Sequence, residues 1–277
     1  MRGAAFLSLL LLAASPAPAQ ISGFERLPIP QIAGHPDASD PPIMGYLFKP
    51  AGAGPFLTVV LMHGCDGLGW ATPQRISWKL QRSYAEHYVA QGYAALVLDS
   101  FAPRRLASIC GDGQRVTGAR RAWDAFAAAD LLVARGVADP ARLVLQGDSH
   151  GGYAVLVALE QGRFAPPHRF AAGIAFYPGC DNATHFARGF SAPLLILIGD
   201  ADDWTPARRC RALADRLARA PRGAPLRLEI FPGATHAFDF PLPARVNELG
   251  HHMAYDAAAT AASLAFIDRF LAEPRIR

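Results

Sequence analysis

Charged residues are scarce in this chain: Asp, Glu, Lys and Arg account for 18% of its 277 residues, against 51% that are hydrophobic. This balance excludes a disordered chain and predicts a folded protein with a substantial core. The basic excess is also small, at 27 basic against 23 acidic residues, and the arginine pairs are scattered along the sequence. Scattered pairs favour solvated helix ends and loops over a nucleic-acid-binding face, so no nucleic acid is expected as a partner.

Long apolar runs are absent after the first 20 residues, so no later segment is expected to cross a bilayer. The beginning of the chain is different, because a basic start precedes an apolar stretch over residues 4–14, and Ala17-Pro18-Ala19 forms an A-x-A cleavage site. This arrangement is typical of a secretory signal peptide, whose apolar part is too short to span a membrane. We therefore expect residues 1–19 to be removed and residues 20–277 to be exported, to the periplasm or out of the cell, without a lipid anchor.

Internal repeats, linkers and low-complexity segments are also missing after residue 19, which predicts one domain over residues 20–277. No C-x-x-C pair or spaced histidine cluster offers the ligands of a metal site, since His251 and His252 are adjacent and would point to different faces of a helix. We expect no metal, no cofactor and no membrane anchor, and a monomer or a weak homodimer.

The chain does contain a regular alternation of apolar strands with helical segments. Strands are predicted at 43–48, 56–62, 93–98, 143–145, 170–176, 193–198 and 226–231. Helices are predicted at 78–91, 119–135, 152–159, 207–220 and 253–271. This order predicts an α/β fold with a mostly parallel, doubly wound sheet and helices on both faces. Ligands of such sheets bind outside the carboxyl ends of the strands.

One predicted strand leads directly into the motif Gly147-Asp148-Ser149-His150-Gly151, and a helix follows it. A strand, a G-x-S-x-G turn and a helix form a nucleophile elbow, which holds a serine on a strained turn at the edge of a sheet. Glycines suit the two flanking positions because side chains there would collide with the neighbouring strand or helix. We therefore interpret Ser149 as a catalytic nucleophile; a packing turn with an inert serine is the alternative.

A serine hydroxyl becomes a good nucleophile only when a base takes its proton and a carboxylate orients that base. Asp202 and His236 follow two later strands, and the order Ser149, Asp202, His236 is the order found in α/β-hydrolases. Asp200 and Asp203 are alternatives for the acid, although a turn cap and a helix N-terminal charge suit them better. The other histidines follow no matching strand or have simpler structural explanations.

The tetrahedral intermediate of acyl transfer needs preorganised donors for its negative charge. One donor is expected from the backbone N–H of His150, which follows the nucleophile, and the second from Cys65 in the turn after the strand at 56–62. Because backbone atoms serve as these donors, the side chains at the two positions carry little information. A long loop at 100–118 follows the next strand, and loops of that length are commonly functional.

Cysteine is rare, with four residues that could form three different pairings. An even number in an exported protein favours disulfides. Cys65 and Cys110 follow consecutive strands that should be neighbours, and Cys180 and Cys210 flank another neighbouring pair. We therefore expect the disulfides Cys65–Cys110 and Cys180–Cys210, the first of which would brace the oxyanion turn. Buried free thiols are the alternative.

Together these motifs resemble the α/β-hydrolase superfamily and, within it, the dienelactone hydrolase family. The resembling segments are residues 63–67, 139–142, 147–152, 199–206 and 233–239, which extend over most of the chain from Phe56 onward. The namesake enzymes of the family use a cysteine nucleophile, whereas this chain has Ser149. The resemblance therefore implies a serine esterase of this family's build rather than a dienelactone hydrolase itself, and it implies no metal and no cofactor.

The resemblance also implies an arginine that binds a substrate carboxylate, for which Arg104 and Arg105 are the candidates. Four aromatic residues lie on loops around the expected mouth of the site and are candidates for substrate binding, with core packing as the alternative for each: Trp70, Phe101, Tyr177 and Trp204. Little sequence is inserted after residue 176 to form a lid, which favours short or bulky soluble esters as small-molecule substrates.

The expected function is hydrolysis of carboxylic esters or lactones through an acyl-enzyme. A peptidase of the prolyl-oligopeptidase type shares this catalytic domain, but no propeller segment precedes it here. An acyltransferase would need only a better nucleophile than water. A hydrolase-fold binding protein without turnover is the alternative from a different class, although the intact Ser, Asp and His argue against it.

Overall fold

The structure, a computed structural model, describes residues 23–32, 40–72, 74–181, 188–219, 222–274 and 276. The predicted signal peptide at residues 1–19 lies outside these residues. Among the helices that the structure describes, none is long and apolar enough to cross a membrane.

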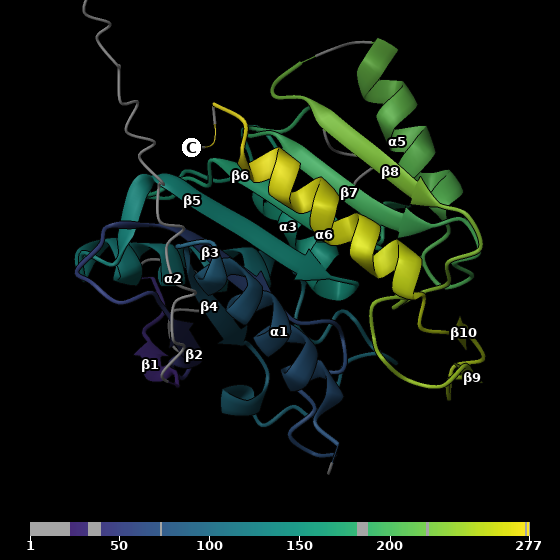
Figure 1. The fold of residues 1–277 in the computed structure, drawn as a ribbon, viewed down its shortest axis with the longest axis horizontal. Helices are drawn as coiled ribbons and strands as arrows, with labels where there is room; N and C mark the ends of the chain where they lie inside the picture. Colours follow the sequence, from purple (N-terminus) through teal and green to yellow (C-terminus); the bar gives the residue numbers. More distant parts are fainter. Residues whose placement is uncertain are drawn as a thin grey trace, which may run out of the picture.

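An eight-stranded sheet runs through the described part of the molecule in the order β1-β2-β4-β3-β5-β6-β7-β8 (Figure 1). The strands are β1 (Glu25–Ile29), β2 (Ile43–Phe48), β3 (Phe56–Met62), β4 (Ala94–Asp99), β5 (Ala138–Asp148), β6 (Ala172–Phe176), β7 (Leu194–Gly199) and β8 (Leu226–Phe231). Strands β3 to β8 pair in parallel, whereas β2 is antiparallel to both of its neighbours. The prediction of a mostly parallel sheet is therefore confirmed.

Helices cover both faces of this sheet. They are α1 (Ile76–Ala90), α2 (Gly118–Ala134), α3 (His150–Ala158), α5 (Ala207–Arg219) and α6 (Ala257–Leu271). In Figure 1, α1 and α6 lie in front of the sheet and α2 and α3 lie behind it. Every residue of β4, β6 and β7 is buried, as expected of parallel strands that are covered on both sides. The chain thus has the doubly wound α/β architecture that the sequence predicts.

The start of the last helix differs from the sequence prediction. Helix α6 begins at Ala257, and Asp256 caps it by accepting a hydrogen bond from the backbone N–H of Ala259 at 2.9 Å. Residues 252–253, expected to lie near the start of this helix, instead form β10 (His252–Met253), which pairs with β9 (Arg245–Val246). The prediction of helix from residue 253 was therefore one turn too early.

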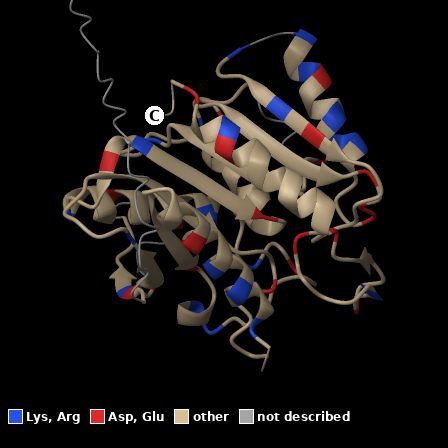
Figure 2. Ribbon diagram, in the orientation of Figure 1, with Lys and Arg blue, Asp and Glu red and all other residues tan. Residues whose placement is uncertain are grey.

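Basic residues are spread over several elements, with the densest group on α5 (Figure 2). This helix carries five arginines in its 13 residues, and Arg209 forms an ion pair with Asp181. The absence of a nucleic-acid partner stays a prediction.

Candidate active site

The turn around Ser149 has the geometry of a nucleophile elbow. Strand β5 ends at Asp148, α3 begins at His150, and Ser149 between them has φ 51° and ψ −115°, a conformation that a residue with a side chain rarely adopts. A Cβ at Gly147 would lie 2.4 Å from the carbonyl carbon of Gly151. The sequence prediction of a tight strand–turn–helix junction is confirmed.

The same turn is pressed against the neighbouring strands. A Cβ at Gly151 would lie 2.2 Å from the carbonyl oxygen of Met62 at the end of β3, so only glycine fits there. The backbone N–H of Ser149 donates to the carbonyl of Phe176 at the end of β6, at 2.9 Å. The position of the serine is therefore set by backbone contacts with the strands on both sides.

Three residues that are far apart in the sequence meet at the carboxyl edge of the sheet. His236 Nε2 lies 3.0 Å from the Ser149 hydroxyl, and His236 Nδ1 lies 2.8 Å from Asp202 Oδ2. Asp202 follows β7 and His236 follows β8, and their exposed fractions are only 3% and 2%. Ser149 is half-buried, so its hydroxyl is the accessible end of this hydrogen-bonded chain.

Of the three aspartates in the turn after β7, only Asp202 contacts the histidine ring of residue 236. Asp200 accepts a hydrogen bond from the backbone N–H of Gly233 at 2.6 Å and thus joins two turns, close to the capping role expected for it. Asp203 accepts from the ring of His252 at 2.8 Å, and α5 begins only at Ala207. The expectation that Asp203 is a helix N-terminal charge was therefore wrong.

Thr205, which the sequence analysis did not single out, joins the histidine to the acid. Its hydroxyl lies 2.8 Å from Asp202 Oδ2, 3.0 Å from His236 Nδ1 and 3.0 Å from the carbonyl of Tyr177. The backbone N–H groups of Thr205 and Trp204 both donate to Asp202 Oδ1. Burial raises the pKa of Asp202, but the hydrogen bonds and charge of His236 together with the Thr205 bonds outweigh it and hold that pKa below its usual value.

Aromatic rings enclose His236. The Trp204 ring centroid lies 4.8 Å from that of His236, and on its other side Trp204 stacks on His251 at 4.9 Å. The Tyr177 ring lies 4.7 Å from His236, but it is fully buried and its hydroxyl donates to Asp239. Trp204 thus remains a candidate for substrate contact, whereas Tyr177 packs in the core behind the histidine.

The other three residues expected to bind substrate have structural partners instead. Arg104 donates to both carboxylate oxygens of Asp124, at 2.7 and 2.8 Å, and to Asp40 at 2.9 Å, so its guanidinium is not available to a substrate carboxylate. Phe101 is 1% exposed, and the Trp70 indole donates to Asp99 at 2.6 Å. The assignment of Arg104 and Phe101 to substrate binding is therefore corrected to ion pairing and packing, whereas substrate contact by the half-buried Trp70 stays a prediction.

The turn after β3 lies beside the nucleophile, because a Cβ at Gly64 would come within 3.5 Å of Ser149 Cβ. Next to Gly64, Cys65 forms a disulfide with Cys110, and the second disulfide joins Cys180 to Cys210. Both predicted pairings are confirmed. Because α3 begins at His150, the first N–H groups of this helix have no partners within it, and the oxyanion role of the Cys65 and His150 N–H groups stays a prediction.

A second group missed by the sequence analysis consists of buried acids behind the nucleophile. Burial raises the pKa of Asp148 well above its usual value, and the nearby charges of Asp66 and Asp239 raise it further, while Arg121 opposes them. Asp239 accepts from the hydroxyls of Tyr84 and Tyr177, both at 2.6 Å. These carboxyls lie in the same motifs as the predicted site, but their burial gave no signal in the sequence.

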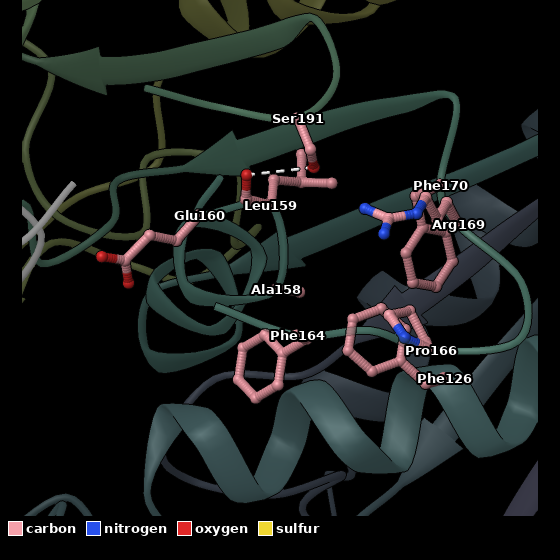
Figure 3. A pocket seen from close by; sticks show the side chains of 9 residues that line it. All are labelled: Phe126, Ala158, Leu159, Glu160, Phe164, Pro166, Arg169, Phe170 and Ser191. Carbon is pink, nitrogen blue, oxygen red and sulfur yellow. Dashed lines mark hydrogen bonds between the residues drawn. The ribbon is translucent and has the colours of Figure 1, made fainter. Parts of the chain in front are cut away.

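A pocket at the other end of α3 is separate from this site (Figure 3). It is lined by Phe126, Phe164, Phe170, Glu160, Arg169 and Ser191, among others. The helix residues at its edge are Ala158 and Leu159, whereas Ser149 precedes the first turn of the same helix. Within the described residues, no group of three or more His, Cys, Asp or Glu side chains is arranged to hold a metal ion.

Comparison with known proteins identifies the family and the fold of the chain. A model of the dienelactone hydrolase family matches residues 43–273. A candidate dienelactone hydrolase of Klebsiella pneumoniae has a similar structure, with a TM-score of 0.66 and 19% identity over 90% of this chain and 96% of that chain. Apo esterase 2 of Thermogutta terrifontis gives 0.63 and 21% over 91% and 95%. The same esterase phosphorylated by paraoxon gives 0.62 and 20% over 91% and 94%.

The two structural likenesses establish the fold, and the family match covers the sheet from β2 onward with all the turns of the site. The chain therefore belongs to the dienelactone hydrolase family and is a carboxylic ester hydrolase with the α/β-hydrolase fold.

Proposed function

We propose that the protein hydrolyses esters or lactones by a two-step acyl transfer in which Ser149 is the nucleophile, His236 the base and Asp202 the acid. The observation that supports these roles is the continuous chain of contacts from Ser149 through His236 to Asp202, at 3.0 and 2.8 Å. A carboxylate only accepts hydrogen bonds, so His236 Nδ1 donates to Asp202 and leaves Nε2 free to accept the serine proton.

In the first step, His236 Nε2 takes the proton from Ser149 as its oxygen attacks the ester carbonyl carbon. The carbonyl π electrons move to the oxygen, which the backbone N–H groups of Cys65 and His150 stabilise. The C–O bond to the leaving alcohol then breaks, and His236 returns the proton to that oxygen. In the second step, water attacks the acyl-enzyme with His236 again as base, which releases the acid and restores Ser149.

Trp204 is the aromatic side chain that we propose for substrate contact, since it is half-buried and lies directly against the His236 ring. We expect a small soluble ester, because residues 177–193 between β6 and β7 add little chain that could cover the mouth of the site. A peptidase or acyltransferase activity would use the same acyl-enzyme, and we rank both below ester hydrolysis because the family match is to a hydrolase of esters.

The decisive experiment measures hydrolysis of p-nitrophenyl acetate and butyrate by the wild type, Ser149→Ala and Ser83→Ala. We expect Ser149→Ala to lose at least about 10⁴-fold in kcat, since removal of a catalytic serine has cost other hydrolases up to about 10⁶-fold. Ser83 is exposed on α1, and its replacement should leave the rate unchanged. Equal activity, or equal inactivity, of the wild type and Ser149→Ala would end the proposal.

An organophosphate provides an independent test of the same serine. The Thermogutta esterase is phosphorylated by paraoxon, and we expect paraoxon to inactivate this protein by phosphorylating Ser149. Peptide mass spectrometry would locate the adduct. Labelling of a different serine, or formation of the same single adduct on the Ser149→Ala protein at the wild-type rate, would contradict the assignment.

The two disulfides indicate an oxidising environment and therefore an exported protein. We propose that residues 1–19 direct this export and are removed, and that residues 20–277 form one domain. Mass spectrometry of the protein recovered from the periplasm or medium should give Gln20 as the first residue; a retained leader would contradict cleavage at this point.

A further inference from the structure

The loop between β4 and α2 contacts both of the proposed oxyanion donors, although the catalytic mechanism gives it no role. It leaves the sheet after Asp99 and ends where α2 begins at Gly118, and only residues 102–104 in it are helical. The part of interest is residues 109–113, called the strap below. One of its ends is attached to the turn that carries Cys65, and its other end is attached to the ring of His150.

The attachment to the Cys65 turn is a covalent bond, and side-chain packing stabilises it further. Cys110 forms the disulfide with Cys65, and the backbone N–H of Ile109 donates to the carbonyl of Cys65 at 2.8 Å. Ile109 is 2% exposed and belongs to a small apolar cluster, separate from the main core, with Phe101 and Val116. Cys65 packs against this cluster. The strap therefore holds the residue on whose backbone N–H the oxyanion hole depends.

The second attachment runs through the side chain of His150. A Cβ at Gly113 would lie 3.7 Å from this ring, and the ring hydrogen bonds to the backbone of Gly113. On its other side, His150 Nδ1 lies 3.3 Å from Nη1 of Arg121 on α2. An arginine only donates, so Nδ1 accepts and the ring proton on Nε2 goes to the Gly113 carbonyl. Burial and the charge of Arg121 lower the pKa of His150 to about 3, which keeps the ring in this neutral form.

Arg121 is itself immobilised. It is fully buried on α2, and its guanidinium carbon lies 5.1 Å from the centre of the Phe101 ring, in the small apolar cluster. Helix α2 is in turn packed on α3, because a Cβ at Gly118 would lie 2.6 Å from the ring of Tyr153. The ring of His150 thus lies between the strap and α2 and contacts both.

We propose that the strap and Arg121 position both halves of the oxyanion hole, so that Cys110, Gly113 and Arg121 are positioning residues for the reaction proposed above, on which this inference rests. The two donors come from different parts of the chain, the turn after β3 and the start of α3. The pairing of β3 with β5 joins these parts up to Met62 and Gly147, and beyond that pairing the strap is bonded to both of them. The distance between the two N–H groups therefore depends on the strap being closed by its disulfide.

This role has a distinctive kinetic signature. Oxyanion donors bind the transition state more strongly than the substrate, so misplacing them lowers kcat and leaves KM nearly unchanged. Losing one donor outright costs about 10²–10³-fold, and a shift of about 1 Å costs up to about 10²-fold. We expect opening of the strap to lower kcat by about 10- to 100-fold.

The test uses the variant Cys180→Ala/Cys210→Ala, in which Cys65–Cys110 is the one remaining disulfide. This variant should keep a kcat within about twofold of the wild type. Treatment with a mild reductant should then lower kcat for p-nitrophenyl acetate by about 10- to 100-fold, with KM within about twofold, and reoxidation should restore it. Mass spectrometry confirms the two free thiols, and near-UV circular dichroism confirms that the reduced protein is folded.

A second measurement separates positioning from a general loss of structure. A trifluoromethyl ketone, which forms a tetrahedral adduct with an active-site serine, should lose affinity in parallel with kcat, whereas a product carboxylate should not. Arg121→Met should show the same pattern, and Arg121→Lys should recover part of the activity because it keeps the positive charge.

The outcomes are distinguishable from failure of the proposed function. A wild type that does not depend on Ser149 refutes the function, whatever the strap does. An enzyme that depends on Ser149 but keeps its kcat when Cys65–Cys110 is reduced, or whose KM rises in proportion as kcat falls, refutes the positioning role alone. Full activity of Arg121→Met would remove Arg121 from it.

Discussion

Ser149 and His236 come from different parts of the same edge of the sheet, and their surroundings are built in different ways. Around Ser149 the contacts are largely between backbones. Gly151 allows the elbow to touch the carbonyl of Met62, and the Ser149 N–H donates to the end of β6. A disulfide at Cys65 then fastens the adjoining turn.

Around His236 the contacts are made by side chains. The Thr205 hydroxyl touches both His236 and Asp202, and the indole of Trp204 covers the ring. Backbone contacts tolerate changes of side chain but no change of glycine. In a side-chain network, in contrast, a single substitution removes one hydrogen bond or ring contact and leaves the others in place. Substitutions of side chains should therefore give graded losses on the His236 side, whereas on the Ser149 side replacement of an elbow glycine should give an all-or-none loss.

The largest graded loss is expected from Asp202→Asn. The amide can present a donor to His236 Nδ1 and so favours the wrong tautomer, which lowers kcat by about 10³–10⁴-fold. Asp203→Asn is the matched control, since Asp203 binds His252 and does not touch His236; its kcat should fall less than about fivefold. Steady-state kinetics on p-nitrophenyl acetate would measure both, and a larger loss in the Asp203 variant would reverse the assignment of the acid.

An intermediate effect is expected from Thr205→Val, which removes the hydroxyl but keeps the backbone N–H that donates to Asp202 Oδ1. A hydrogen bond to a charged group contributes about 1.5–3 kcal/mol, and we expect about a tenfold loss of kcat at the lower end of this range. Thr205→Ser should retain the rate within about twofold. If Val and Ser at this position give equal rates, the hydroxyl has no part in holding the histidine.

The smallest effect is expected on the Ser149 side, from Asp148→Asn, and it concerns stability. The pKa of Asp148 is raised in the folded protein above its value in the unfolded chain, about 3.9. As pH rises above 3.9 the unfolded chain loses its proton first, so the wild type loses stability until pH passes the raised pKa. An asparagine does not titrate and should gain a few degrees in Tm near pH 8 relative to the wild type, with the gain vanishing near pH 4.

Thermal unfolding followed by circular dichroism between pH 4 and 9 would measure this difference. Asp139→Asn is a suitable control, because hydrogen bonds from Ala141 and Arg142 lower the pKa of that half-buried carboxyl. Its effect should have the opposite sign, with stability lost at neutral pH. The Gln81 amide donates to Asp148 Oδ1 at 2.5 Å. A destabilisation of Asp148→Asn that is the same at every pH would mean that loss of this hydrogen bond, rather than charge, dominates at this position.

The sequence alone predicted the structural features that depend on the local pattern of apolar residues and glycines. The strand at 226–231 was predicted with its observed bounds, and the tight turn around Ser149 was predicted although β5 extends further on both sides and α3 begins two residues earlier than expected. The sequence did not predict the ion-pair partners of Arg104. These are the carboxylates of Asp40 and Asp124, which lie 64 and 20 residues away in the chain. The sequence does not distinguish an arginine that pairs with a carboxylate of the protein from one that binds a substrate carboxylate.

Thr205 was missed for the same reason. Its distance from His236 is 31 residues, and a threonine at the start of a helix is most simply explained as a cap. The early start predicted for α6 has a local cause, since Asp256 stops the helix at a position where the apolar pattern continues. The order of strands and turns in the sequence thus predicted which turns come together. The hydrogen bonds between side chains of these turns were visible only in the structure.

The backbone conformation of Ser149 has a consequence for how this protein can change. With φ at 51°, this position is one where glycine would be relaxed and serine is not. The residues that follow β6 and His236, Tyr177 and Ala237, are also held at positive φ. Selection in the laboratory for heat tolerance alone would therefore tend to replace the nucleophile by glycine, and a more durable but inert protein would be the natural end point of such a search.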